Sequence, residues 1–263
     1  MPSGVIVLLK PGRSFLNPHF LFILKLYIMS SAFSKTPYSP YDRHRGPHPG
    51  IIAVVYAFLF IASLVCFGVL SHGSGFPMPF GPIDKAQQVF LQYPDAIKFN
   101  ALIQFGAAIP LAIFTAAVTS RLSFLGVNVT GVSIALFGGI AASLLITISS
   151  LCGWILAQPG VANDRNIMHV VQLFSFASGG VAHVVALGLL MAGVSVPCLF
   201  GKYTPKWLAW LGLILAGIAE LSTLSLVFQQ LTFLLPIARF TSYIWMIGSG
   251  FTLTKNRPES AAS

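Results

Sequence analysis

Six long apolar stretches constrain this chain more than any other feature of its sequence. They cover residues 51–70, 101–119, 132–156, 170–194, 207–228 and 233–253. Each is close to the ~20 residues that an α-helix needs to cross ~30 Å of hydrocarbon, at a rise of about 1.5 Å per residue. Only 8% of the residues are charged, against roughly 25% in a soluble domain. The pattern therefore predicts an all-α, polytopic membrane bundle with six transmembrane helices.

The apolar stretches divide the chain into three regions. The membrane domain is expected at residues 51–254, followed by a tail at 255–263. Residues 1–50 are expected to form a poorly ordered or interfacial tail, because a span there would bury Lys25 at a cost of about 2.5–3.5 kcal/mol. Met29 is an alternative translation start, which would leave residues 1–28 untranslated. Within the loop 71–100, residues 84–93 are expected to form a short surface helix that Pro94 ends.

The Lys and Arg residues, 15 in all, are distributed unevenly between the two ends of the spans. With six spans, both tails share one side with the second and fourth loops, and this side holds 11 of the 15. The other side holds the remaining four, which are Lys85, Lys98, Arg165 and Arg239. Because cytoplasmic loops carry the excess of positive charge, the distribution predicts that both termini are cytoplasmic. Without residues 1–28 the split is 8 to 4, so the prediction does not depend on the start site.

The net charge of +9 would suggest a nucleic-acid partner if the chain were soluble. Here the basic residues lie mostly in tails and loops, where they signal topology and contact anionic lipid. The lipid bilayer is therefore the expected partner, and no nucleic acid is expected. The sequence also leaves two further possibilities, namely a homo-oligomer and a complex with another membrane protein.

Two ionisable residues inside the predicted spans form the first candidate site, since burying such groups is costly. Glu220 lies in the fifth span and Arg239 lies early in the sixth, at similar distances from the turn near residues 229–230. In an antiparallel hairpin the two residues would reach a similar depth, so we predict a buried ion pair. Such a pair either fixes the register of the hairpin or forms a proton or substrate site.

Three further residues form a candidate intramembrane polar site: Gln104, His169 and His183. The two histidines are 14 residues apart, which is close to four α-helical turns, so they are expected on one face of the fourth span about 21 Å apart. Histidines on such a face could serve a haem, whereas the small residues beside His183, Gly179 and Gly180, favour a hydrogen bond across a close helix contact.

No catalytic motif accompanies these residues. The sequence has no CxxC pair among its three cysteines and no Walker, HExxH or GxSxG motif. We therefore predict no metal, no cofactor and no enzymatic activity. Three sets of small residues predict close helix contacts instead, namely Gly138-Gly139-Ala142, Gly188-Ala192 and Gly212-Ala216.

Several segments between residues 100 and 257 are similar to those of a known protein family. They are QFGAAIPLAIFT at 104–115, ALFGG at 135–139, PKWLAWLGL at 205–213, AELSTL at 219–224 and LPIARF at 235–240. Together they resemble a family of uncharacterised bacterial integral membrane proteins with a domain of unknown function. The resemblance implies a six-span protein of a bacterial inner membrane, and it implies no activity.

Three functions stay open at this point. The leading expectation is a non-enzymatic, multi-pass protein of the bacterial inner (cytoplasmic) membrane that acts as an accessory or sensor module. The first alternative is a small-solute or proton-coupled transporter, and the absence of a convincing inverted repeat between the two halves lowers it. The second alternative is a haem or quinone redox protein, which rests on the histidines.

Overall fold

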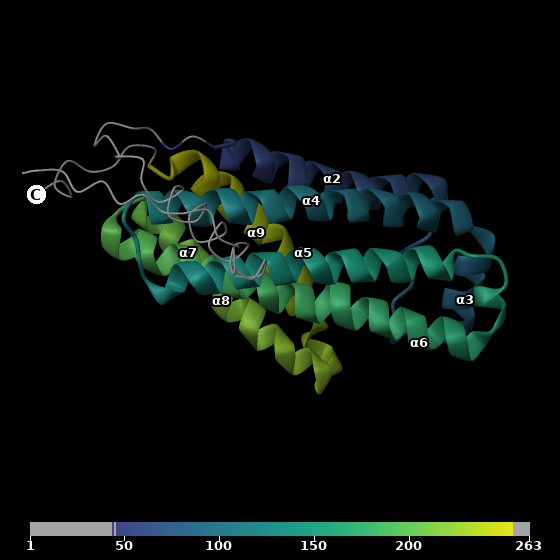
Figure 1. Ribbon diagram of the computed structural model, residues 1–263. Coiled ribbons are helices and arrows are strands. Elements are labelled where there is room, and N and C mark those ends of the chain that lie inside the picture. Colours follow the sequence, from purple (N-terminus) through teal and green to yellow (C-terminus); the bar gives the residue numbers. More distant parts are fainter. Residues whose placement is uncertain (1–43, 45, 255–263) are drawn as a thin grey trace, which may run out of the picture. The chain divides into compact units, whose positions relative to one another are not determined.

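The structure is a computed structural model, and it describes residue 44 and residues 46–254. Every regular element in this part of the chain is helical (Figure 1). In chain order the elements are α2 (Pro49–Leu70), α3 (Ile83–Gln92), α4 (Pro94–Phe124), α5 (Thr130–Leu156), η1 (Val161–Asn163), α6 (Arg165–Phe176), η2 (Ala177–Ala182), α7 (His183–Gly201), α8 (Lys206–Leu221), η3 (Ser222–Leu226), η4 (Gln229–Phe233) and α9 (Leu234–Thr252). Most of the predicted N-terminal tail, including the alternative start at Met29, and the tail at 255–263 lie outside the described residues.

Six helical segments are long and apolar enough to cross a membrane, which confirms the predicted six-span helical bundle. They are Pro49–Leu70, Pro94–Phe124, Thr130–Leu156, Arg165–Gly201, Lys206–Leu226 and Gln229–Thr252. The fourth segment is longer than predicted, with 37 residues, because α6, the π-helix η2 and α7 follow one another without a break. A short helix is also found where the surface helix was predicted, as α3.

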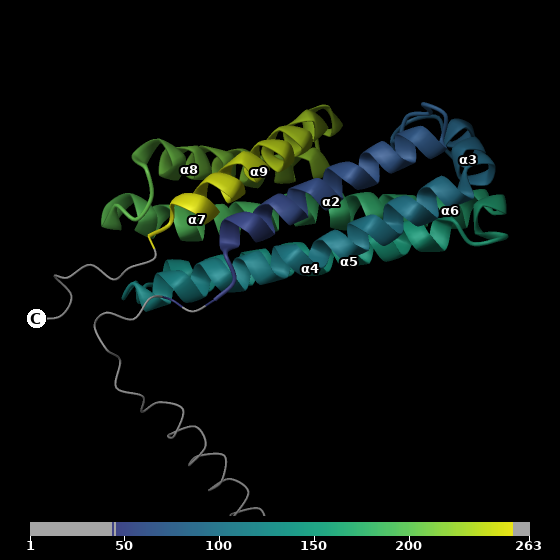
Figure 2. The same cartoon turned by 90° about the horizontal axis from the view of Figure 1, so that it is seen from above.

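The spans pack in chain order around a closed ring. α2 packs on α4, α4 on α5, α5 on α7, α7 on α8 and α8 on α9, and α9 returns to α2. α3 lies at one end of the bundle, beside the end of α2 and the start of α4 (Figure 1). The hairpin of α8 and α9 stops well short of that end in both views (Figure 2). Part of the space beyond the hairpin is therefore left to the connection between α2 and α3.

Local sequence signals determine where several helices begin and end. Pro94 opens α4 in the first turn, where its missing N–H costs nothing. The Asp164 carboxylate caps α6 by accepting hydrogen bonds from the backbone N–H groups of Asn166 and Ile167, at 2.9 and 3.0 Å. Gly126, with φ of 86°, follows the end of α4 in the left-handed conformation that glycine adopts without strain.

Small residues bring neighbouring spans into close contact at the three predicted sets. A Cβ atom on Gly138 would lie 2.6 Å from Cβ of Leu189, so α5 and α7 depend on its absence. A Cβ atom on Gly188 would lie 2.9 Å from Cβ of Ala219, and one on Gly212 would lie 2.8 Å from Cδ1 of Trp245. These close approaches fix the positions of the helices that carry the candidate site.

Candidate functional site

Arg239 of α9 projects into the bundle and binds backbone carbonyls rather than a carboxylate. Its Nη2 donates hydrogen bonds to the carbonyl oxygen of Gly179 and, at 3.3 Å, to that of Gly180. Its guanidinium carbon lies 5.4 Å from the centre of the Phe60 ring, a cation–π distance. Nε of Arg239 is buried and has no hydrogen-bond partner. The cation is therefore only partly satisfied by neutral groups.

The two carbonyl groups belong to the π-helix η2, Ala177–Ala182. A π-helix replaces the usual i→i+4 bonds with i→i+5 bonds, and it is found frequently at functional sites. The glycines also allow α5 to approach: a Cβ atom on Gly179 would collide with the side chain of Ser149. Oγ of Ser149 donates to the carbonyl oxygen of Ser175, at 2.9 Å. The wide turn thus offers acceptors to α9 while it packs closely on α5.

The predicted ion pair between Glu220 and Arg239 is wrong. Glu220 is exposed on the surface of α8, and its Oε1 lies 3.1 Å from the point where a Cβ of Gly188 would stand. The prediction assumed that two regular α-helices run to a short turn. The tip of the hairpin instead contains two 3₁₀ segments, η3 and η4, whose three residues per turn rotate the following side chains away from the expected faces.

The remaining acidic side chains of the described residues have other partners. Asp84 pairs with Arg165 at 3.0 Å and Asp95 pairs with Lys98 at 3.3 Å, while Asp164 caps α6. Within the part of the chain that the structure describes, Arg239 therefore has no carboxylate partner.

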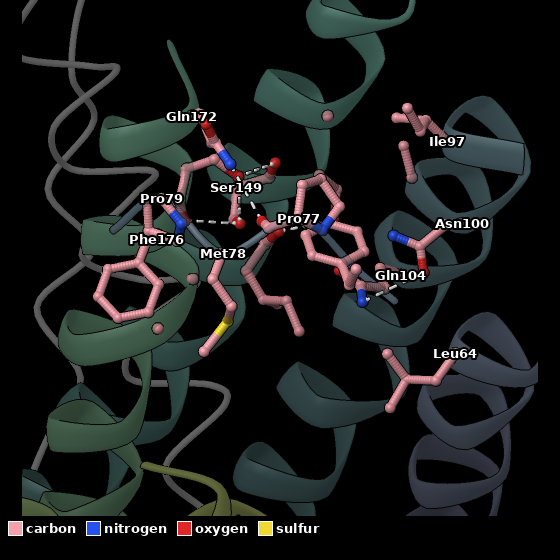
Figure 3. Close-up of a pocket in the computed structure, with 18 of the residues that line it drawn as sticks. Leu64, Pro77, Met78, Pro79, Ile97, Asn100, Gln104, Ser149, Gln172 and Phe176 are labelled. Carbon is pink, nitrogen blue, oxygen red and sulfur yellow. Dashed lines mark hydrogen bonds between the residues drawn. The ribbon is translucent and has the colours of Figure 1, made fainter. Parts of the chain in front are cut away.

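Arg239 lines a cavity of about 420 Å³ inside the bundle. Apolar side chains form most of its surface, including Leu64, Ile97 and Phe176. Figure 3 shows Gln172 and Phe176 of α6 on one side of the view and Asn100 and Gln104 of α4 on the other. The polar groups of its lining are few: Asn100, Gln104, Ser149, Ser150, Gln172, Ser175, Thr232 and Arg239.

The connection between α2 and α3 covers part of this cavity. Pro77, Met78 and Pro79 contribute to its lining and lie between the two walls in Figure 3. Nε2 of Gln172 donates a buried hydrogen bond to the carbonyl oxygen of Pro77, at 3.0 Å. Next to it, the rings of Phe80 and Phe176 meet edge to face, with centroids 5.2 Å apart. We call residues 74–80 the cover segment, because these contacts hold the segment against α6.

The three residues of the predicted polar site do not come together. Gln104 lines the cavity, with Nε2 3.5 Å from Oδ1 of Asn100. His183 is completely buried outside the lining, where Nδ1 donates to the carbonyl oxygen of Ala142 at 2.8 Å. His169 does not line the cavity either. The continuous α-helical register assumed between the two histidines is wrong, because η2 lies between them.

His183 belongs to an aromatic layer on the side of the cavity that faces the start of α2. With Nδ1 donating, Nε2 is the acceptor for the hydroxyl group of Tyr56, at 3.4 Å. The ring of Tyr56 meets that of Tyr243 edge to face, with centroids 5.4 Å apart. Tyr56 and Tyr243 lie about one turn beyond Phe60 and Arg239 on α2 and α9. This layer closes the bundle between the cavity and the ends of those helices.

No pattern in the sequence predicted that Asn100, Gln172, Ser175 or the carbonyl groups of η2 belong to a site. Asn100 and Gln172 lie near the ends of spans, where polar residues are common. Only the run from Ser175 to Gly180, with two hydroxyl groups and two adjacent glycines in a span, could have indicated an unusual stretch of helix. Backbone acceptors carry no signal of their own in a sequence.

The fold and the cavity define a multi-pass helical membrane protein with an internal pocket. Among the described residues, no group of three or more His, Cys, Asp and Glu side chains is placed to hold a metal ion. No protein-family model, curated protein or solved structure matches the chain. The function is therefore argued from the cavity itself.

Proposed function

We propose that this protein is a non-enzymatic, multi-pass membrane protein that binds a small, largely apolar molecule in its cavity, in the role of a sensor or accessory module. The cavity carries the proposal. Its volume of about 420 Å³ falls in the range of roughly 300–1,000 Å³ that is typical of small-molecule sites. Apolar walls with a few convergent polar groups are also typical of such sites.

The aromatic layer favours binding over transport. A transporter must open a path on both sides of its site. The layer of Tyr56, His183 and Tyr243 blocks the side toward the start of α2, where Tyr56 and His183 are fully buried. The histidines that supported a haem protein do not line the cavity. The redox alternative thereby loses its main support.

We further propose a bacterial inner membrane with both termini in the cytoplasm, as the Lys and Arg distribution predicts. Arg239 lies within the bundle rather than in a loop, so it is not counted among the loop residues. The count of Lys and Arg is then 11 on the side of the termini and 3 on the other side. A green fluorescent protein fused to the C-terminus should fluoresce in bacterial cells. A dark but full-length fusion would contradict this topology.

Binding to the cavity can be tested with a neutral apolar probe. Radiolabelled dodecanol should bind saturably to the protein in phosphatidylcholine nanodiscs, above its partition into empty nanodiscs. Ala101 is buried in the lining, so Ala101→Leu should weaken binding about 5- to 150-fold, because overfilling a packed site costs about 1–3 kcal/mol. Ala116 is exposed on the same helix, and Ala116→Leu is the matched control. Absence of saturable binding to the wild type would refute the proposal.

A further inference from the structure

We infer that the cavity recognises a single acidic group on an apolar chain, and that Arg239 is the residue that recognises it. The ligand class is an anionic amphiphile, with a carboxylate or phosphate head and one hydrocarbon tail. This inference rests on the proposed function and deepens it. It follows from three observations on the described residues: the unpaired cation, its remaining donors and the surface around it.

The first observation is a cation without a counter-charge inside a membrane bundle. A charged side chain at this depth is costly, and such residues usually pair with another charge or mark a ligand path. Arg239 is 13 residues from Thr252, the end of α9, or about 20 Å along the helix axis. No described carboxylate pairs with it, since Asp84 and Asp95 are paired elsewhere and Glu220 is exposed on α8. An anionic ligand would supply the missing charge.

The second observation concerns the donors of the guanidinium group. Arginine has five N–H donors, in a planar arrangement that suits carboxylates and phosphates. Within the described residues, Nη2 is the guanidinium nitrogen that donates to the protein, toward Gly179 and Gly180. Nε has no partner. The carbonyl groups thus orient Arg239 through Nη2 and leave the N–H groups of Nη1 for an acidic group.

The third observation concerns the surface beyond Arg239. The Phe60 ring, which lies 5.4 Å from the guanidinium carbon, lines the cavity. Ile146, Phe240, Leu64 and Ile97 also belong to its apolar lining. A small, strongly hydrated anion would gain no binding free energy from these apolar walls. Each CH₂ group of a hydrocarbon tail, in contrast, contributes favourable free energy when it is buried there. The combination of one cation and extended apolar walls therefore selects an amphiphile over an inorganic anion.

The test compares probes that share one tail and differ in their heads. Dodecanoate and dodecyl phosphate should bind the wild-type protein in phosphatidylcholine nanodiscs about tenfold to a hundredfold more tightly than dodecanol, because hydrogen bonds to a charged group are the stronger ones. Arg239→Gln should abolish this preference, so that the two acids lose their tenfold to hundredfold advantage over dodecanol. Arg239→Lys should keep part of it, since the charge remains.

A control separates recognition from a structural role of Arg239. If Arg239→Gln weakened all three probes equally, the residue would serve only to hold α9 against η2, and the inference would be refuted. If that variant failed to fold, the affinities of the wild-type protein for the three probes would still test whether the cavity prefers an acidic head group. Equal binding of dodecanol and the two acids would refute the inference while leaving the proposed function intact. Binding of none of the probes would refute both.

The source of the acid can be distinguished in the same assay. Replacing part of the phosphatidylcholine with lysophosphatidylglycerol, an anionic lipid with one tail, should displace dodecanoate if a single-chain anionic lipid of the membrane is the natural occupant. If dodecanoate binding is unchanged, the occupant is a free single-chain acid. Either result supports recognition of an anionic amphiphile by Arg239.

Discussion

Removing the hydrogen bond between Gln172 and Pro77 should release the cover segment from the cavity. We consider Gln172→Met, which keeps the length of the side chain and removes its donor. The bond is 3.0 Å long and buried, so its loss leaves a buried carbonyl without a partner, at a cost of about 1–3 kcal/mol. The ring contacts of Phe67 with Phe76 and of Phe80 with Phe176 remain. The expected effect is therefore local opening, not unfolding.

The size of the effect follows from the free energy. A loss of about 1–3 kcal/mol raises the equilibrium constant for opening roughly 5- to 150-fold. Amide hydrogen exchange in a peptide that covers residues 74–81 should accelerate by this factor. Gln158→Met is the matched control, because Gln158 donates to the carbonyl oxygen of Trp154 in an exposed position. Unchanged exchange in Gln172→Met would show that this bond does not hold the cover segment.

Two further predictions concern helix packing and pH. Gly138→Ala should be less stable than Gly217→Ala by about 1–3 kcal/mol in an SDS unfolding titration, because the new Cβ meets Leu189 in the first case and open space in the second, while the gain in helix propensity is shared. Equal stabilities would contradict the close packing of α5 on α7. Burial and, secondarily, the positive charge of Arg121 lower the pKa of His44 below its ordinary value of 6.5. The docking of His44 against α4 should therefore be complete above about pH 6.5 and weaken as the pH falls below it. Hydrogen exchange at residues 46–52, corrected for its intrinsic pH dependence, should accelerate below this pH in the wild type. The same acceleration should be absent in His44→Gln.

The six spans and the surface helix could be predicted because their signals are local. Each span is an uninterrupted apolar run, and a backbone in hydrocarbon must satisfy its own hydrogen bonds, so a helix is the result. Close helix contacts at Gly138, Gly188 and Gly212 were equally predictable, since small residues in a span allow backbones to approach. In each case the physical cause lies in neighbouring residues.

The site depended on details that are not local. Pairing Glu220 with Arg239 required both to keep an α-helical register up to the turn, and two 3₁₀ segments change that register. Placing His169 and His183 on one face required a regular fourth span, and η2 interrupts it. A change of one hydrogen-bond step in the backbone leaves the amino-acid composition unchanged. It nevertheless rotates every following side chain relative to its neighbours.

The coincidence of Arg239 with η2 is the strongest argument for a function at this site. A charged side chain in a span and a departure from α-helical hydrogen bonding are each unfavourable taken alone. α9 also has contacts that involve neither feature: it packs on α2 and α8, and Nε1 of Trp245 donates a hydrogen bond to Oγ of Ser195, at 3.1 Å. Both unfavourable features meet at the wall of the cavity. The binding of an anionic ligand at this wall would give one physical reason for both.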